Sequence, residues 1–281
     1  MAFTKNGRCN EDFELHRYMD FTKLVSLLDS SSLFFTRLSC FEDHLEGSLT
    51  HHHILLETKV VDRWYHFANY TLPHSFVAKK ESQRTETPII KDPPEHFINT
   101  VFGDFPVKQT DARDLFKRHR EWLDVSCWHA GSSESMAMWK IYGGSVDAVC
   151  VISSTDSLAR SICADPKYQL FLTDVHYIAH EEDSFQSSDP LAPYFHKHHF
   201  YSFEKEVRLI SYDPRDNVFG DRPECERGTI HKVNLHELIT KVVVAPQAPG
   251  WFFDLVCTLV KDKYGLKVDV TRSKMNQPPI Y

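Results

Sequence analysis

The segment Leu15-His16-Arg17-Tyr18 places a cation and aromatic rings at the end of a strand-like run. In an extended strand, His16 and Tyr18 share one face and Arg17 points to the other. A guanidinium can bind two phosphate oxygens at once, and an aromatic ring can stack on a flat ligand, so these side chains suit a nucleotide. The alternative is a surface arginine beside a tyrosine of the core. The segment alone leaves both interpretations open.

A second candidate is the acidic loop at residues 40–47, with the sequence Cys-Phe-Glu-Asp-His-Leu-Glu-Gly. Its carboxylates Glu42, Asp43 and Glu46, with the imidazole of His44, could hold a divalent cation or orient a hydroxylated substrate. The spacing differs from that of an EF-hand, whose ligands and glycine fall at other intervals. The alternative is a solvated acidic loop that caps the neighbouring elements.

A third segment combines a serine, a thiol, a histidine and several aromatic residues: Ser126, Cys127, Trp128, His129, Met136, Trp139 and Tyr142. Met136, Trp139 and Tyr142 recur at three-residue spacing, which places them on one face of a helix. Such a stripe forms either part of the core or a wall against which a ring-shaped ligand stacks. Cys127 and His129 share a strand face, but the sequence shows no third orienting group and no thiol-protease signature.

A fourth segment, at residues 203–210, alternates charged and apolar side chains. In an extended strand, one face carries Glu204, Glu206, Arg208 and Ile210. One interpretation is a ladder of ion pairs facing solvent, which contributes little to stability. The other is a carboxylate that Arg208 holds and aims into a cleft, where it could stabilise a developing cation or accept a hydrogen bond from a sugar hydroxyl.

The 17 histidines include two runs that look like metal sites, at residues 51–53 and 196–199. Neither run gives the His-Glu-x-x-His pattern or a zinc spacing of cysteine and histidine. Consecutive residues of a helix diverge by about 100° each, so at most one or two histidines of a run could share an ion. We therefore expect no metal.

The composition is that of a folded chain of 281 residues, with a formal net charge of −7 and 42% hydrophobic residues. This acidic balance argues against a protein that coats DNA or an anionic membrane. No apolar run reaches about 18 residues, so we expect no membrane partner. The seven cysteines include no CxxC pair, and the first residues lack the apolar run of a secretion signal. Both observations favour reduced thiols and a cytoplasmic location.

Strands and helices alternate irregularly, which favours an α+β fold over a doubly wound sheet. Hydrophobic periodicity predicts helices at 20–29, 51–70, 94–120, 132–142, 154–162, 190–199 and 249–263. Strand-like runs occur at 11–19, 33–38, 122–128, 146–152, 168–178, 205–211, 228–233, 241–245 and 266–270. Residues 71–96 are predicted to form an exposed connection. We expect a single domain over residues 1–281, with mixed or antiparallel sheets, flanking helices and a helical insertion at about 51–120.

Taken in order, five parts of the sequence resemble a mostly bacterial family catalogued as domain of unknown function 2971. They are the strand and helix at 15–29, the loop at 41–46, the Ser-Cys-Trp strand at 126–128 with the Met-Trp-Lys-Ile-Tyr helix at 138–142, the strand at 201–208, and the closing segment at 241–274. The likeness extends over nearly the whole chain except about 60–115. Arg17 stands where the family more usually has histidine or lysine, and Glu42 and His44 stand for asparagine and proline.

The order of these segments is also similar to the plan of ADP-ribosyltransferases, which place a basic residue on the first strand and a glutamate on a late strand. The resemblance implies an ADP-ribosyltransferase-like fold with NAD as the substrate. It implies that Arg17 pairs with the pyrophosphate, that Tyr18 or Trp139 stacks on a ring, and that Glu206 faces the ribose while nicotinamide leaves. Breaking this bond builds an oxocarbenium-like cation, which a nearby carboxylate stabilises.

We therefore predict NAD-dependent ADP-ribosyl transfer or NAD cleavage, with Glu206, Arg17 and Ser126 as the catalytic residues. The predicted ligand-binding residues are His16, Tyr18, Trp128, Trp139, Tyr142 and Arg208. The acceptor stays open between protein, nucleic acid and water, and in bacteria such activities often serve as toxins or defence effectors. One alternative is a non-catalytic nucleotide-sensing or protein-interaction module. Another is a nucleic-acid hydrolase that uses Glu42, Asp43, Glu46 and Glu206. The leading hypothesis requires Arg17 and Glu206 to face one cleft.

Overall fold

A computed structural model describes residues 3–50, 97–106, 111–144, 146–163, 165–185, 189–223 and 226–276. Ten strands of this part form one sheet: β1 (Phe3–Lys5), β2 (Glu14–Asp20), β3 (Ser32–Arg37), β6 (Asp124–Ala130), β7 (Ala148–Ser154), β8 (Gln169–Asp174), β11 (Glu206–Tyr212), β12 (Gly228–Lys232), β13 (Lys241–Val244) and β14 (Asp269–Arg272). Two smaller sheets pair β4 (Phe97–Thr100) with β5 (Gly103–Pro106) and β9 (His176–Ile178) with β10 (His196–His198).

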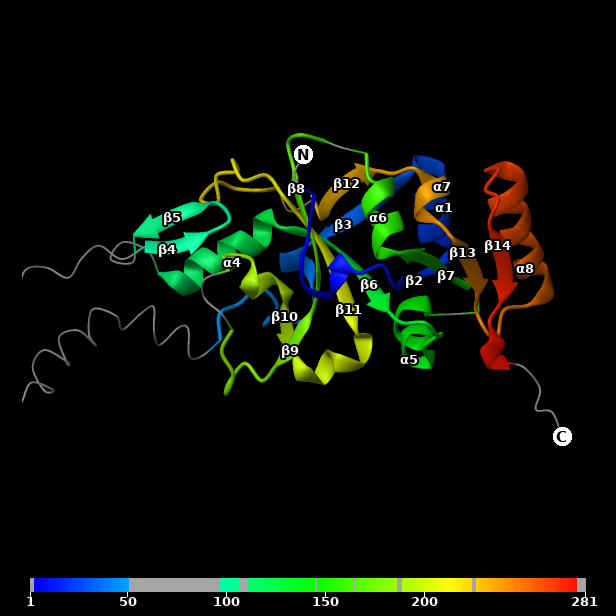
Figure 1. Cartoon of the computed structure of the whole chain (residues 1–281), viewed down its shortest axis with the longest axis horizontal. Coiled ribbons are helices and arrows are strands. Elements are labelled where there is room, and N and C mark those ends of the chain that lie inside the picture. The colour runs from blue at the N-terminus through cyan, green and yellow to red at the C-terminus, as the bar shows by residue number, and fades with distance from the viewer. Residues whose placement is uncertain are drawn as a thin grey trace, which may run out of the picture.

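The strands of the large sheet follow the order β1-β8-β11-β6-β2-β7-β13-β14, and β12 and β3 join this path at β6. Most neighbours are antiparallel, whereas β1 with β8 and β13 with β14 are parallel. The helices are α1 (Phe21–Ser30), α4 (Ala112–Trp122), α5 (Met136–Met138), α6 (Thr155–Ser161), α7 (Leu235–Leu238) and α8 (Gly250–Cys257). Figure 1 shows them packed around the twisted sheet, which confirms the predicted α+β class with a mixed sheet.

The sheet opens beside β6, because two strands share one edge of this strand. β2 pairs with β6 only through Leu15 and His16 and then continues along β7. β3 pairs with the other end of the same edge, through Thr36 and Arg37. The edge of β6 at residues 126–128 is therefore left between β2 and β3.

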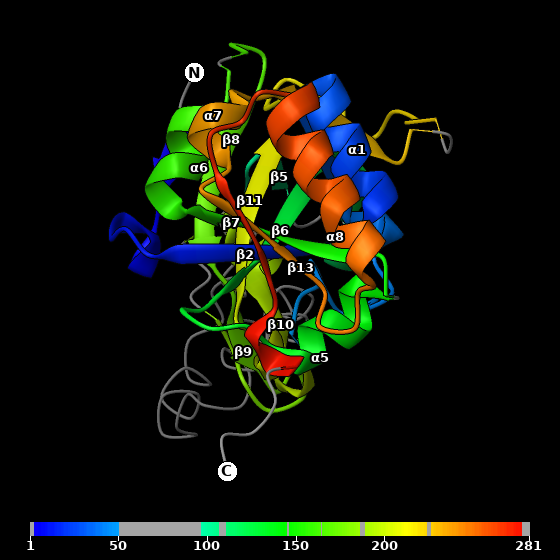
Figure 2. The ribbon, with the colours of Figure 1, turned by 90° about the vertical axis from the view of Figure 1, so that its right-hand side faces the viewer.

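Helix α1 is bounded by a capping aspartate at its N-terminus and a left-handed residue at its C-terminus. The Asp20 carboxylate accepts a hydrogen bond from the Lys23 backbone N–H (2.8 Å), so Asp20 caps the N-terminus of the helix. Leu24 and Leu28 bury the apolar face, and the helix ends at Ser31, which adopts a left-handed conformation (φ 46°). Helix α8 lies beside α1 (Figure 2), and the rings of Phe21 and Phe252 meet edge to face at 5.3 Å.

Two buried clusters of apolar side chains hold the elements together. The larger cluster packs α1, α6, α7 and α8 against β2, β7 and β13, with Leu15, Leu24 and Val151 among its members. The smaller cluster packs α4 against the other end of β6 and β11, around Leu115 and Tyr194. The opening between β2 and β3 lies where these two clusters meet along β6.

Two predicted helices are corrected by the structure. Residues 94–120 do not form one helix: β4 and β5 form a hairpin that turns at Gly103 (φ 120°), and only α4 is helical. The predicted helix at 190–199 is a short 3-10 turn (Ala192–Phe195) followed by β10, because β10 finds a parallel partner in β9. The predicted helix at 51–70 and connection at 71–96 lie outside the described residues. In the helix expected at 132–142, α5 continues as a π-helix (Trp139–Gly143).

Candidate functional site

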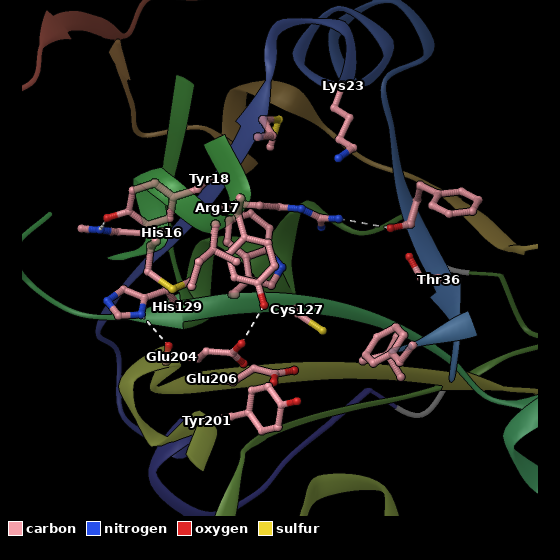
Figure 3. A pocket seen from close by; sticks show the side chains of 18 of the residues that line it. His16, Arg17, Tyr18, Lys23, Thr36, Cys127, His129, Tyr201, Glu204 and Glu206 are labelled. Carbon is pink, nitrogen blue, oxygen red and sulfur yellow. Dashed lines mark hydrogen bonds between the residues drawn. The ribbon is translucent and has the colours of Figure 1, made fainter. Parts of the chain in front are cut away.

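A cavity of about 770 Å³ occupies the opening of the sheet (Figure 3). Its walls come from β2, α1, β3, the 40–46 loop, β6, the π-helix, β10, β11 and the 3-10 helix before it (His199–Glu204). This volume lies within the usual range for small-molecule sites. Arg17 and Glu206 both line this cavity, as the leading hypothesis requires.

Arg17 reaches across the opening of the sheet and contacts its far side. Its guanidinium donates hydrogen bonds to Ser126 Oγ on β6 and to the Phe34 carbonyl oxygen on β3 (3.3 Å). The guanidinium carbon lies 5.5 Å from the ring centre of Trp128, whose indole N–H also donates to Ser126 Oγ (3.2 Å). Burial lowers the pKa of Arg17, and guanidinium groups remain charged in proteins. Within the described part of the chain, no carboxylate forms an ion pair with Arg17.

Glu206, the first residue of β11, is held from several sides. Arg208 donates to both of its oxygens, from Nε to Oε1 (2.7 Å) and from Nη2 to Oε2 (3.0 Å). Lys197 Nζ lies 3.3 Å from Oε2, and the backbone N–H of Glu206 donates to the Tyr177 hydroxyl (2.8 Å). Burial alone would raise the pKa of Glu206, but Arg208 and Lys197 outweigh burial and lower it to about 2. Glu206 is therefore an ionised carboxylate in a fixed orientation.

Lys197 joins three carboxylates, one from the acidic loop at 40–47 and two from the segment at 203–210. Its ammonium lies 2.7 Å from Glu204, 3.0 Å from Glu46 and 3.3 Å from Glu206. All four side chains are at most 7% exposed. Burial opposes the charge on Lys197, but the three carboxylates raise its pKa. This carboxylate network, defined as Glu46, Glu204, Glu206, Lys197 and Arg208, has three acids and two bases and thus one net negative charge when all are ionised.

A backbone turn brings Glu204 and Glu206 into one network. Lys205 between them has a left-handed backbone (φ 42°, ψ 51°), a conformation that costs a non-glycine residue about 1 kcal/mol or more. Glu204 accepts a hydrogen bond from the Tyr142 hydroxyl (2.7 Å), and its carbonyl oxygen accepts one from His129 Nδ1. Both carboxylates line the cavity (Figure 3).

A wall of rings closes another side of the cavity. The rings of His16, Tyr18 and His129 lie 6.1 Å from one another, centre to centre. Trp139 packs edge to face on Tyr18 at 4.9 Å and is shielded from the cavity. His16 Nε2 lies 2.6 Å from Glu14 Oε1.

The structure brings most of the predicted site residues to one place. Those that line the cavity are Glu206, Arg17, His16, Tyr18, Trp128 and Tyr142. Three others stand behind this first layer: Ser126 bonds to Arg17, Trp139 supports Tyr18, and Arg208 holds Glu206. The acidic loop divides, since Glu46 is 1% exposed and joins the carboxylate network, whereas Glu42 is exposed. The charged face of the 203–210 segment is buried and does not face solvent.

Sequence reasoning missed Lys197 and the position of Glu46. Lys197 lies within the run of histidines that was predicted to be helical, and in the structure the strand β10 turns it inward. If the charged face of the 203–210 segment is buried, Arg208 alone does not balance the carboxylates of Glu204 and Glu206, and this imbalance indicates a second base. The sequence gives no means of choosing which lysine supplies it.

Three absences apply to the described residues. No group of three or more histidine, cysteine, aspartate or glutamate side chains in that part could hold a metal ion. None of its helices is long and apolar enough to cross a membrane. Its six cysteines are unpaired.

Comparisons with known proteins give no relative for this chain. No family model matches it, and no curated protein or solved structure matches it either.

Proposed function

We propose that the cavity binds NAD and that the protein cleaves the bond between nicotinamide and ribose, transferring ADP-ribose to an acceptor or to water. The observation that carries the proposal is that Arg17 and the ionised Glu206 line the same cavity. Arg17 has no acidic partner among the described residues. The opening of the sheet between β2 and β3, with Arg17 on one side and β11 on the other, supports an ADP-ribosyltransferase-like arrangement.

The charges of the cavity match those of NAD. Arg17 presents a positive charge at the opening of the sheet, and the carboxylate network presents one net negative charge below it. NAD has a negative pyrophosphate and a positive nicotinamide ring. A guanidinium binds phosphate oxygens in a fork, and a buried negative charge attracts the cationic ring more strongly than it would in water.

In the proposed reaction, the bond between ribose C1′ and the nicotinamide ring nitrogen breaks, and its electron pair leaves with nicotinamide. The leaving group becomes neutral, and the positive charge moves to C1′ and the ribose ring oxygen. An ionised Glu206 stabilises this cation, as carboxylates do in glycoside hydrolysis. An oxygen or nitrogen atom of the acceptor then bonds to C1′ and gives its proton to water.

The support around Glu206 suits this role. Arg208 and the Tyr177 hydroxyl fix the residue before substrate arrives, so little reorganisation is needed when charge develops. Arg208 and Lys197 reduce the local negative charge but do not cancel it, because Glu46 and Glu204 add two further carboxylates. The rings of Trp128, Tyr142 and Tyr18 offer apolar surface for the flat parts of the substrate.

The proposal is tested by incubating the purified protein with NAD and measuring free nicotinamide over time. The same assay is run with protein, oligonucleotide or no added acceptor, and the fate of ADP-ribose is followed. We expect release from NAD and none from NADH, which keeps the pyrophosphate but has a neutral dihydronicotinamide ring. Binding of NAD without release, under all acceptor conditions, would favour a nucleotide-sensing module and contradict the proposal.

A further inference from the structure

We infer that Glu46 is a positioning residue that sets the charge of the carboxylate network, and thereby how strongly Glu206 stabilises the substrate cation. The inference rests on the proposed function and gives a role to the acidic loop at 40–47. In this role the Glu46 carboxylate acts through Lys197 and Arg208 and does not contact the reacting atoms.

Glu46 is held in a position from which it can change the charge around Glu206. Its Oε1 lies 3.0 Å from Lys197 Nζ, and its Oε2 accepts a hydrogen bond from Arg208 Nη2 (2.7 Å). These are the same two cations that hold Glu206. Gly47 follows with a left-handed backbone (φ 73°), and a Cβ there would lie 2.7 Å from a methyl carbon of Leu38, so the turn is tightly packed. Glu46 therefore competes with Glu206 for two shared cations.

Several elements place charged or titratable groups around Glu46. Lys197 comes from β10, Glu204 from the 3-10 helix, and both Glu206 and Arg208 come from β11. Cys127 on β6 and Arg120 on α4 also interact electrostatically with Glu46. Arg120 donates to the carbonyl oxygens of Asp43 and His44 and forms no direct pair with Glu46.

Protonation of this network falls on Glu46 before it falls on Glu206. Burial raises the pKa of Glu46, and although Arg208 and Lys197 oppose this effect, the neighbouring Glu206 adds to it. The pKa of Glu206 is instead lowered to about 2. As the pH falls, a proton on Glu46 changes the network from one net negative charge to zero. Arg208 and Lys197 are then shared by fewer carboxylates and neutralise Glu206 more completely.

The test is a double-variant cycle in full-length protein, read as nicotinamide release from NAD at several pH values. Glu46→Gln leaves the network neutral, Lys197→Met leaves it with two net negative charges, and the double variant restores one. We expect the wild-type rate to fall on acidification. Glu46→Gln should release nicotinamide about tenfold more slowly at pH 7.5 and should not show that fall. The double variant, whose network again has one net negative charge, should release nicotinamide faster than Glu46→Gln.

A purely structural role would give a different pattern. Each variant would have both a lower melting temperature and a lower rate of nicotinamide release, and both would be lowest in the double variant. The pH profile of the rate would keep its shape. That pattern would overturn the inference, as would an unchanged rate in Glu46→Gln. No release by the wild type would overturn the proposed function and this inference together.

A second measurement does not depend on activity. Carbon-13 NMR of glutamate carboxyl groups identifies Glu46 as the resonance missing from Glu46→Gln. We expect this resonance to titrate above the ordinary glutamate pKa of about 4.3. Titration at or below that value would overturn the inference even if the enzyme cleaves NAD.

Discussion

Arg17 is a cation whose partners in the described structure are neutral oxygen atoms and the face of a tryptophan ring. Removing a cation from a surface ion pair costs little, because water and the partner both readjust. Arg17 differs, since burial lowers its pKa and thus disfavours its charge. An anionic ligand would relieve that penalty, which is why the phosphates of a nucleotide are the expected partner.

Arg17→Met should weaken binding of ADP-ribose at least about tenfold, and Arg17→Lys should recover only part of the loss, because lysine cannot fork two phosphate oxygens. Lys23→Met is the matched control: Lys23 also lines the cavity, but its side chain is 71% exposed and pairs with Asp20 (3.2 Å). Calorimetric titration with ADP-ribose, which cannot be cleaved to nicotinamide, measures each affinity. Equal losses in Arg17→Met and Lys23→Met would argue against a specific phosphate contact.

At the scale of elements, the junction between the 3-10 helix and β11 decides where both glutamates lie. Lys205 forms this junction with a left-handed backbone and an exposed side chain. Its backbone is fixed by two hydrogen bonds, from its N–H to Ser202 and from the Ala130 N–H to its carbonyl oxygen. The strained backbone of Lys205 therefore sets the positions of Glu204 and Glu206 relative to each other.

Lys205→Gly should raise the free energy of unfolding by about 1 kcal/mol, because glycine adopts this conformation without a Cβ clash. Lys205→Val should lower it by a similar amount and reduce nicotinamide release, since a β-branched residue disfavours positive φ. Ser31→Gly is a control for the backbone effect alone, because Ser31 has φ 46° at the end of α1. Urea unfolding measures all three. A Lys205→Val variant with wild-type stability would contradict the argument.

Sequence patterns could predict the elements whose signals are local. The N-cap at Asp20 and the face shared by Glu206 and Arg208 depend on spacing within one segment. The hydrogen bond between Arg208 and Glu46 joins residues 162 positions apart, so no window of sequence contains both. Lys197 was missed for the same reason, because its role follows from the pairing of β10 with β9. Local periodicity also cannot show that the sheet opens beside β6.

At the scale of the whole molecule, burial of a neutral histidine links folding to pH. His119 on α4 is fully buried in the smaller cluster; its Nδ1 lies 2.7 Å from the Tyr194 hydroxyl, and its Nε2 has no hydrogen-bond partner in the described structure. Burial lowers the pKa of His119 to about 3, from about 6.5 when exposed. Between pH 6.5 and about 3, His119 therefore binds a proton in the unfolded chain but not in the folded protein.

The stability that depends on neutral His119 is fully present above pH 6.5 and is lost as the pH falls toward 3. By pH 4 the loss should reach about 3 kcal/mol. His119→Phe should flatten this part of the pH dependence, whatever its effect at pH 7, whereas His236→Gln, an exposed control on α7, should not. Urea unfolding at pH 4–7 measures the difference, and parallel curves for wild type and His119→Phe would refute the prediction.

The most direct test of the central claim is the single-turnover rate of nicotinamide release by wild type and Glu206→Gln. The claim predicts release by the wild type and a rate at least about 100-fold lower in Glu206→Gln, with ADP-ribose affinity within about threefold. Glu237→Gln, which changes a surface glutamate paired with Arg160, should match the wild type. Equal rates in wild type and Glu206→Gln, or no release by the wild type, would contradict the claim.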